Sequence, residues 1–509
     1  MKKILYSSLF LSILQSILFW DKIPGISVVL FIIPTILLVL YNLNEKQMIN
    51  NKKGILWAIP IILLSLTYFI FNNSLFQILN VPVIFVLIII MCISITEGKI
   101  SESRFIRKIL GKLIKPFSLI FEFISDFEVN EFFEKEKENQ NEKIEFAKKL
   151  GKSILISIPV IIIIIILLSS ADSVFENIFK DISELISKAF SNAKISDVIW
   201  RIVCIVISCI YIIGFIVTFT KNRDTEEEKF EDSKKINLSC LTINTLLTSL
   251  NIIYFIFSII QFKYLFINAG KTANFDYATY ARTGFFQLMF VSFINLGLIK
   301  VSKNVQNEKF SKILKIFLII FTIIIVISAM FRMHLYEQEY GYTYLRLFVY
   351  FILVTEILIL VPVLMEICGQ KLDTFKISLE IIVIMYVILN FINIDYIIAK
   401  NNIDRYLSDP ENATLDAYYI ARATGTDAIK EKIKILNQDD SKLSYEKKEK
   451  LKNIQGIIKT DLRDYKLRYG SNYKPNFSEW NLSKLQVYKL LEKVDLTDKS
   501  SSLKYYTEY

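Results

Sequence analysis

Histidine and cysteine are scarce in this chain, and neither occurs in a pattern typical of a chemical site. The 509 residues include one histidine, His334, and five cysteines that form no C-x-x-C pair. Imidazole pairs for acid-base work and thiolate clusters for zinc are therefore missing. The cysteine spacing does not indicate a disulfide framework either. We predict neither a metal site nor a bound cofactor.

Catalytic and nucleotide-binding signatures are also absent from the sequence, which therefore does not predict an enzyme. The net charge of +10 is a feature of many nucleic-acid-binding proteins. In a membrane chain, however, an excess of lysine and arginine first indicates which loops stay inside the cell. We expect no nucleic-acid partner.

What the sequence does contain is a series of long apolar runs. Hydrophobic residues make up 53% of the chain, and the mean hydropathy is +0.43. Each run is close to the ~20 residues that a helix needs to cross a bilayer, where only helices and closed barrels satisfy the backbone. We predict an all-α fold, a polytopic transmembrane helical bundle of about 11 spans with a C-terminal soluble helical domain. The predicted spans are residues 4–20, 26–41, 55–71, 76–95, 153–170, 198–219, 238–262, 283–301, 313–331, 345–366 and 377–395.

The distribution of basic residues predicts the direction of these spans. With the N-terminus inside, the inner loops hold more than twice as many lysines and arginines as the outer loops, as the positive-inside rule requires. An odd number of spans then places the tail outside the cytoplasmic membrane. The predicted domains are four N-terminal spans over 1–96, a cytoplasmic amphipathic and charged connection over 97–152, a seven-span membrane domain over 153–395 and an extracytoplasmic helical tail over 396–509.

Polar residues inside the predicted spans are candidates for function. Glu356 lies near the middle of the tenth span, where an ionisable group costs about 2.5 kcal/mol or more. Asn244 and Asn251 share one face of the seventh span, and Asn295 lies on the eighth. These residues form either a proton- or cation-coupled path or a set of hydrogen bonds that joins helices.

Tyrosine and arginine are concentrated in the two predicted outer loops that precede the eighth and tenth spans, and another arginine follows the eleventh. Four guanidinium groups fit an anionic headgroup, phosphate or carboxylate. Pairing with local carboxylates is the alternative. The candidate ligand-binding residues are Tyr277, Tyr280, Arg282, Arg332, Tyr336, Arg346 and Arg405, and the candidate carboxylates are Asp276, Glu337, Glu339, Asp395 and Asp404.

Several blocks of sequence occur in a fixed order between residues 150 and 490. They include Tyr280-Ala-Arg-Thr-Gly-Phe-Phe286, the segment from Arg332 to Arg346, and Asn393-Ile-Asp-Tyr-Ile-Ile-Ala-Lys-Asn-Asn-Ile-Asp-Arg-Tyr406. Shorter ones lie at 171–175, 415–419, 426–428 and 480–483. In these blocks the chain resembles the bacterial polytopic membrane family called domain of unknown function 4173. The resemblance implies a multi-pass membrane location and supplies no activity or catalytic residues.

We therefore expect a non-enzymatic integral membrane protein of a bacterial cytoplasmic membrane. Its partners are membrane lipids and, through the outward face, an envelope protein or an anionic ligand. An ion- or proton-coupled transporter or channel that uses Glu356 is the alternative. A membrane enzyme acting on an anionic lipid-linked substrate, with Arg282 and Arg346 as clamps, is the third hypothesis, although no nucleophile or base is evident.

Overall fold

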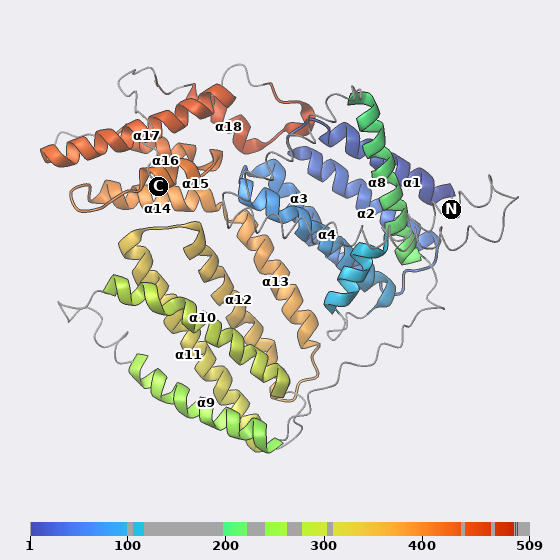
Figure 1. The fold of residues 1–509 in the computed structure, drawn as a ribbon, viewed down its shortest axis with the longest axis horizontal. Coiled ribbons are helices and arrows are strands. Elements are labelled where there is room, and N and C mark those ends of the chain that lie inside the picture. The colour runs from blue at the N-terminus through green and yellow to red at the C-terminus, as the bar shows by residue number, and fades with distance from the viewer. Residues whose placement is uncertain are drawn as a thin grey trace, which may run out of the picture. The chain divides into compact units, whose positions relative to one another are not determined.

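The computed structural model describes residues 2–98, 105–116, 197–220, 240–261, 277–302, 309–438, 443–469 and 474–492, with positions 494 and 496. Every regular element within these residues is a helix (Figure 1). The elements are α1 (Lys2–Phe19), α2 (Ile26–Glu45), η1 (Lys52–Trp57), α3 (Ala58–Ile70), α4 (Ser74–Glu97), α8 (Asp197–Thr220), α9 (Cys240–Gln261), α10 (Tyr277–Ser302), α11 (Lys309–Tyr340), α12 (Tyr344–Ile367), α13 (Thr374–Phe391), α14 (Ile394–Ser408), α15 (Ala417–Ala423), η4 (Thr426–Ala428), α16 (Ile429–Leu436), α17 (Tyr445–Tyr469), η5 (Phe477–Glu479) and α18 (Leu482–Leu491).

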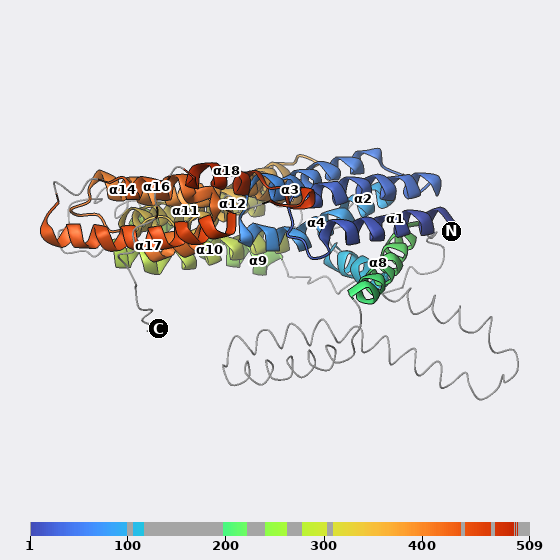
Figure 2. The ribbon, with the colours of Figure 1, turned by 90° about the horizontal axis from the view of Figure 1, so that it is seen from above.

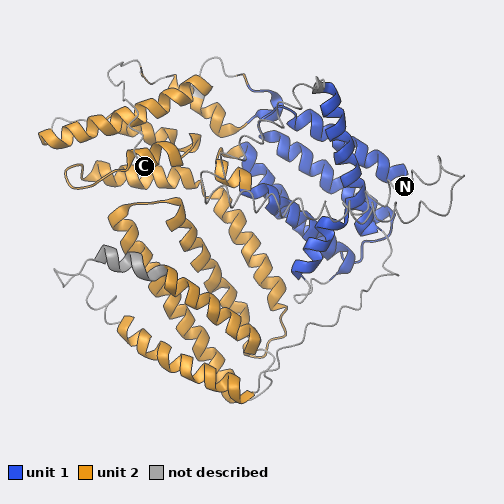
Figure 3. Cartoon of the chain, in the orientation of Figure 1, with its two compact units in different colours: residues 1–69, 79–225, 475–480 blue, residues 70–78, 226–474, 481–509 orange. Residues whose placement is uncertain are grey.

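The chain forms two compact units, which Figure 3 colours separately. Unit 1 contains residues 1–69, 79–225 and 475–480, and unit 2 contains residues 70–78, 226–474 and 481–509. The boundary passes through α4, so its first turn belongs to the same unit as α9–α18. The boundaries of these units differ from those of the four domains predicted from the sequence. The predicted domain boundaries stay a prediction.

In unit 1, buried serines on α1 line its contacts with α2 and α8. Asn42 of α2 donates a hydrogen bond to Ser7 Oγ at 3.1 Å, and Arg201 of α8 donates one to Ser16 Oγ at 2.7 Å. Small polar residues let membrane helices approach closely and bond to one another. The first predicted span is therefore joined to its neighbours by hydrogen bonds as well as by apolar contact.

Helix α11 is central to the membrane part of unit 2, where α9, α10 and α12 pack against it. Leu318, Val326 and Met333 repeat at helical spacing on its buried face. Phe317 and Ile320 are exposed on other faces. Large exposed apolar side chains suit contact with lipid, which is as apolar as the helix core.

Helices α14–α18 form a second packed region of unit 2, and Figures 1 and 2 show α14 and α16 side by side. Ile398, Ile420 and Ile458 belong to its hydrophobic core. Phe76, in the first turn of α4, joins this core, and its ring centroid lies 5.9 Å from that of Phe348 on α12. The tail is thus packed onto the ends of α4 and α12 and does not form a separate core.

Nine of the described helices are long and apolar enough to cross a membrane, by length and composition. Each corresponds to one predicted span. The predicted span at 283–301 falls within α10, whose apolar part is the shorter helix Phe286–Ser302. The predicted span at 153–170 lies outside the described residues. The all-α multi-pass fold is confirmed, while the count of 11 and the inside position of the N-terminus stay predictions.

The outer loop predicted over residues 332–346 is wrong, because most of this segment is helical. Helix α11 continues to residue 340 and α12 begins at residue 344, which leaves three connecting residues. Gly341 ends α11 with φ at +78°, and its N–H donates to the Glu337 carbonyl at 2.7 Å. The polar end of α11 stays helical because its side chains have partners; Arg332, for example, donates to Gln261 Oε1 at 3.0 Å.

The last predicted span, 377–395, is interrupted. Helix α13 ends at Phe391, and α14 begins at Ile394 with Asn393 as its N-cap. The Asn393 side chain accepts the Tyr396 N–H at 3.1 Å, which satisfies a backbone donor in the new first turn. The chain therefore leaves the spanning helix four residues before Asp395, and α14 belongs to the tail.

Candidate functional site

Asp395 occupies the first turn of α14, just after this break, and its side chain is almost fully buried, with 1% exposed. Asn73 Nδ2 donates to its Oδ1 at 3.0 Å. The Gly425 N–H donates to its Oδ2 at 2.9 Å. One carboxyl group therefore joins three segments of the chain: the turn before α4, the start of α14 and the loop after α15.

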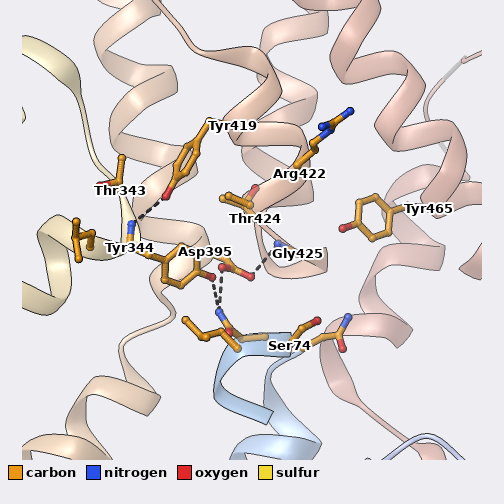
Figure 4. A pocket seen from close by; sticks show the side chains of 14 residues that line it. Ser74, Thr343, Tyr344, Asp395, Tyr419, Arg422, Thr424, Gly425 and Tyr465 are labelled. Carbon is orange, nitrogen blue, oxygen red and sulfur yellow. Dashed lines mark hydrogen bonds between the residues drawn. The ribbon is translucent and has the colours of Figure 1, made fainter. Parts of the chain in front are cut away.

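Asn73 extends these bonds to α12. Its Nδ2 also donates to the Tyr344 hydroxyl at 2.5 Å, while its Oδ1 caps α4 by accepting the Phe76 N–H at 3.0 Å. The Tyr344 N–H, in the first turn of α12, donates to the Tyr419 hydroxyl at 3.0 Å. The first turns of α4, α12 and α14 thus meet at one place (Figure 4). Helix N-termini carry partial positive charge, which favours a carboxylate nearby.

Gly425 is needed because the backbone of the neighbouring turn comes close. A Cβ at this position would lie 2.8 Å from the Asn72 carbonyl oxygen. Two further tail residues hold the same α3–α4 turn: Asp427 Oδ2 accepts the Asn72 N–H at 3.0 Å, and Asn481 Nδ2 donates to the carbonyl of Phe71 at 2.8 Å. Segments more than 350 positions apart are therefore fixed together by hydrogen bonds.

A pocket of about 660 Å³ lies beside Asp395 (Figure 4). Tyr344 and Tyr419 lie on one side of the carboxyl group in this view and Tyr465 on the other. Arg422 lies at the rim with its guanidinium directed away from Asp395. Arg422 is exposed and forms no hydrogen bond or ion pair with any residue that the structure describes. The remaining lining residues are Asn72, Asn73, Ser74, Leu75, Thr343, Leu345, Ala423, Thr424 and Gly425.

Burial controls the charges around this pocket. It raises the pKa of Asp395 to about 7; the nearby Asp427 adds to the increase, while the Gly425 N–H and Lys432 oppose it. Burial also raises the pKa of Asp427. Lys432 is fully buried, and burial lowers its pKa, although the ion pair with Asp461, 2.7 Å away, opposes that decrease. The carboxyl group in the pocket thus titrates near neutral pH.

Two of the predicted ligand-binding arginines have partners inside the protein. Arg346 is largely buried; it donates to the Gly341 carbonyl, and its guanidinium carbon lies 4.2 Å from the Tyr336 ring centroid. Arg405 donates to the carbonyls of Gln338 at 2.8 Å and of two further residues. Neither arginine has a carboxylate within ion-pair distance in the described part of the chain. The expected alternative, pairing with carboxylates, is therefore replaced by capping of the C-terminal end of α11.

The other predicted binding residues are placed less completely. Arg332 is buried on α11 and donates to Gln261. Tyr277, Tyr280 and Arg282 fall in the first turns of α10, but their side chains lie outside the described residues. Their role in binding stays a prediction. The Arg346 contacts leave that side chain poorly placed to clamp a lipid-linked substrate.

Glu356 belongs to a separate polar cluster within the membrane helices. It is 2% exposed, and Ser292 on α10 donates to its Oε2 at 2.8 Å. Its Oε1 has no hydrogen-bond partner among the described residues. One turn along α10, Asn295 accepts the Tyr254 hydroxyl at 2.8 Å and donates to Thr322 at 3.0 Å. Residues of α9, α10, α11 and α12 thus contribute polar groups to this part of the bundle.

The other two predicted intramembrane residues join α9 to α11. Ser311 donates to Asn244 Oδ1 at 2.6 Å, and Asn251 Nδ2 donates to the Leu314 carbonyl at 2.9 Å. Glu356 thus bonds Ser292 on α10, and Asn295 bonds α9 and α11 one turn further along that helix, whereas Asn244 and Asn251 join α9 to α11.

Sequence reasoning did not single out the residues that build the pocket. Asp395 was considered only as a partner for arginine, and Asn73, Tyr419, Arg422 and Gly425 were not proposed as a site. A signal was nevertheless present: the blocks at 332–346, 393–406, 415–419 and 426–428 all contribute to the pocket or to its borders.

Fold and composition define the class: this is an integral membrane protein, an all-helical multi-pass bundle with a tail of helices. The chain belongs to the family described as Domain of unknown function (DUF4153), whose family model matches residues 58–435. No curated protein and no solved structure matches the chain. The site therefore has to be interpreted from its own geometry.

The family match partly confirms the resemblance stated from the sequence. An unknown-function family is confirmed, but the matching model is DUF4153 and not the expected 4173. The match begins at residue 58 and so includes α3 and α4, which the resemblance left out. It ends at residue 435, before α17 and α18. Both sides of the Asp395 junction, Asn73 and Gly425, lie within it.

Proposed function

We propose that this membrane protein binds a small ligand with an anionic group in the pocket beside Asp395. The observation that carries the proposal is a pocket of about 660 Å³ with the exposed Arg422 at its rim. Small-molecule sites are mostly preformed hollows in which a few polar groups converge. The predicted role of the outward face, binding an envelope partner or an anionic ligand, thereby moves from Arg346 and Arg405 to Arg422, whose guanidinium is available for a bidentate contact.

The predicted topology supports an outward position for this pocket. The turn at 71–73 follows the third predicted span, the turn at 341–343 follows the ninth, and α14 follows the eleventh. With the N-terminus inside, odd-numbered spans end outside. These three segments meet within unit 2, so they must share one side of the membrane. We propose that this side is the outer face of a bacterial cytoplasmic membrane.

Retention of a ligand by the purified protein tests the proposal. The full chain is solubilised in mild detergent and analysed by native mass spectrometry, and any retained species is then identified. We expect the wild-type protein to carry a small anionic molecule that Arg422→Ala no longer retains. Lys430→Ala is the matched control, because this substitution also removes one positive charge. Lys430 is exposed on the adjoining α16 and does not line the pocket.

Two results would overturn the binding proposal. One is a wild-type protein that carries nothing and whose melting temperature does not respond to a panel of small phosphates and carboxylates. The other is equal loss of ligand in Arg422→Ala and Lys430→Ala, because the effect would then come from net charge and not from the pocket.

Transport is a second candidate function, and a different observation favours it. Glu356 is buried in α12 with Oε1 unpartnered among the described residues, and polar groups from α9, α10 and α11 lie nearby. Ionisable groups inside a membrane commonly mark ion pathways or proton relays. We propose Glu356 as the coupling residue of such a path.

Flux in reconstituted vesicles decides between these candidates. If transport is correct, Glu356→Gln abolishes proton or cation flux, whereas Glu380→Gln keeps it. Glu380 is a suitable control, because it is a partly exposed carboxylate on α13 that pairs with Lys376 at 3.7 Å. Wild-type flux no greater than that of empty vesicles would remove this candidate and leave ligand binding untouched.

A further inference from the structure

Among the residues that the structure describes, no cation lies within ion-pair distance of the buried Asp395 carboxyl group, in contrast to two other buried charges of the tail. Lys432 pairs with Asp461 at 2.7 Å, and Glu431, 2% exposed, pairs with Lys434. Among the described residues, Asp395 accepts hydrogen bonds from a neutral amide and a backbone N–H. A buried carboxylate is costly unless it is paired with a cation or protonated. The ionised form of Asp395 therefore lacks a cation partner among the described residues.

The charged groups around Asp395 do not supply that group. Lys432 acts on Asp395 only at longer range, because its ammonium is held by Asp461 and by the Thr424 carbonyl at 2.9 Å. Asp427 adds negative charge to the same region. Arg422 is directed away from Asp395 at the rim (Figure 4). Neither Lys432 nor Arg422 therefore contacts the Asp395 carboxyl group directly.

Aromatic rings also surround the Asp395 carboxyl group. Tyr344, Tyr419 and Tyr465 line the pocket around Asp395. The faces of tyrosine rings attract cations, and aromatic residues with a carboxylate are typical of sites for substituted ammonium groups. Lys432 already uses the Tyr465 ring in this way, with Nζ 5.3 Å from its centroid.

We infer that the ligand of this pocket carries an ammonium group, which pairs with Asp395 among the tyrosine rings, at the opposite end from the anionic group that meets Arg422. The inference rests on the proposed binding function and specifies its ligand class as zwitterionic. An amino phosphate has both groups. It can be a free solute or the headgroup of an aminophospholipid, because both carry an ammonium group and a phosphate group.

Binding of two related probes tests the ammonium group. Affinities of O-phosphoethanolamine and of glycerol 3-phosphate are measured by calorimetry on the full chain in nanodiscs of phosphatidylglycerol. Both probes offer a phosphate to Arg422, but only the first carries an amine. We expect the amine probe to bind about tenfold more tightly, as one charge-assisted hydrogen bond allows. Asp395→Asn should reduce this ratio to about one, and Arg422→Ala should weaken both probes.

Two measurements keep the test valid if Asp395→Asn fails to fold. In the wild-type protein, the preference for the amine probe should increase from about pH 6 to about pH 8, because Asp395 ionises in that interval. Tyr419→Leu should lower the preference several-fold without changing the affinity for glycerol 3-phosphate. Nanodiscs that contain phosphatidylethanolamine separate the two sources: weaker binding of the soluble probe there identifies the lipid headgroup as a competitor, and unchanged binding identifies a free solute.

The outcomes distinguish the two proposals. Equal affinities for both probes at every pH would overturn the ammonium inference while leaving an anion-binding pocket. Failure of both probes to bind, in either lipid, together with no retained ligand, would overturn the proposed function as well. A preference for the amine probe that survives Asp395→Asn in a folded protein would assign the ammonium contact to a residue other than Asp395.

Discussion

Two buried carboxyl groups of unit 2, Asp395 and Glu356, have opposite surroundings. Their exposed fractions are 1% and 2%. Asp395 accepts hydrogen bonds on both oxygens from segments far apart in the sequence. Glu356 accepts a hydrogen bond from Ser292 on Oε2, and its Oε1 has no partner among the described residues. The first carboxyl group bonds two distant segments of the chain, whereas the second bonds one side chain of a neighbouring helix.

The difference follows from where backbone donors are available. Asp395 lies among the first turns of α4, α12 and α14, where N–H groups have no partner within the helix. Glu356 lies in the middle of α12, where the helix uses its own backbone donors and lipid supplies none. Only side chains such as Ser292 can then bind the carboxyl group. A carboxyl group at a helix junction can therefore be structural, while one at mid-span is available for a proton or a cation.

The largest loss of stability is expected when Lys432 is substituted. Its fully buried ammonium donates to Asp461 at 2.7 Å and to the Thr424 carbonyl at 2.9 Å. Lys432→Met leaves Asp461 without its cation, so we expect the free energy of unfolding to fall by about 3–5 kcal/mol. Denaturant titration in detergent, followed by circular dichroism, measures this loss. Lys430→Met, exposed on the same helix, should change it by less than about 0.5 kcal/mol.

A similar loss in both lysine variants would show that the junction does not depend on the buried pair. It would also remove the contrast between Asp395 at the helix junction and Glu356 within the membrane helices.

The next largest loss of stability is expected in the turn that joins α11 to α12. Gly341 has φ at +78°, and a Cβ there would collide with the Asn402 side chain, which bonds both the N–H and the carbonyl of Tyr342, at 2.7 and 2.8 Å. Gly369 also has positive φ, at +106°, but nothing lies near its Cβ position. Gly341→Ala should therefore cost about 1–3 kcal/mol more than Gly369→Ala. Equal melting temperatures of the two variants would show that Asn402 moves aside freely.

The pH dependence of stability isolates the Asp395 carboxyl group. Its pKa is raised from 3.8 to about 7 in the folded protein, so the protonated group stabilises the fold. This contribution is complete below pH 3.8 and is lost as the pH rises toward 7. Asp395→Asn does not titrate, and its amide opposes one of the two donors. We expect the wild type to exceed the variant in melting temperature by more at about pH 5 than at about pH 8.

Asp427, whose pKa is also raised by burial, is present in both proteins, and its charge acts on Asp395. A difference in melting temperature that is constant with pH would show that Asp395 stays in one protonation state. The increase in preference for the amine probe between about pH 6 and about pH 8 would then not be expected.

The spanning helices were predictable from sequence, because about 20 consecutive apolar residues leave few alternatives in lipid. The end of α11 was not. Its polar residues were interpreted as a loop, since their partners, such as Gln261 for Arg332, come from a helix 71 positions away. A hydrogen bond to a distant segment leaves no local pattern in one sequence.

The candidate site was hidden for the same reason. Asn73, Asp395 and Gly425 each occur in ordinary turn or cap positions, and hundreds of residues separate the first from the others. Charge and spacing predict Arg346 and Arg405 as ligand-binding residues, because each guanidinium offers several donors. In the structure both donate to carbonyls of their own chain. Arginine in an outer loop is a poor guide to a ligand site when a helix end lies nearby.

The smallest effect is expected at Glu356, and it decides whether the contrast between the two carboxyl groups is real. Glu356→Gln keeps an oxygen that can accept the Ser292 hydroxyl, now 2.8 Å from Oε2, and places its amide where Oε1 has no partner. We expect a change of about 0–1 kcal/mol in the free energy of unfolding, below the cost of Asp395→Asn at about pH 5. Denaturant titrations of both variants at that pH give the comparison. If Glu356→Gln were as destabilising as Asp395→Asn, the mid-span carboxyl group would also be structural, and its use as a coupling residue for transport would lose support.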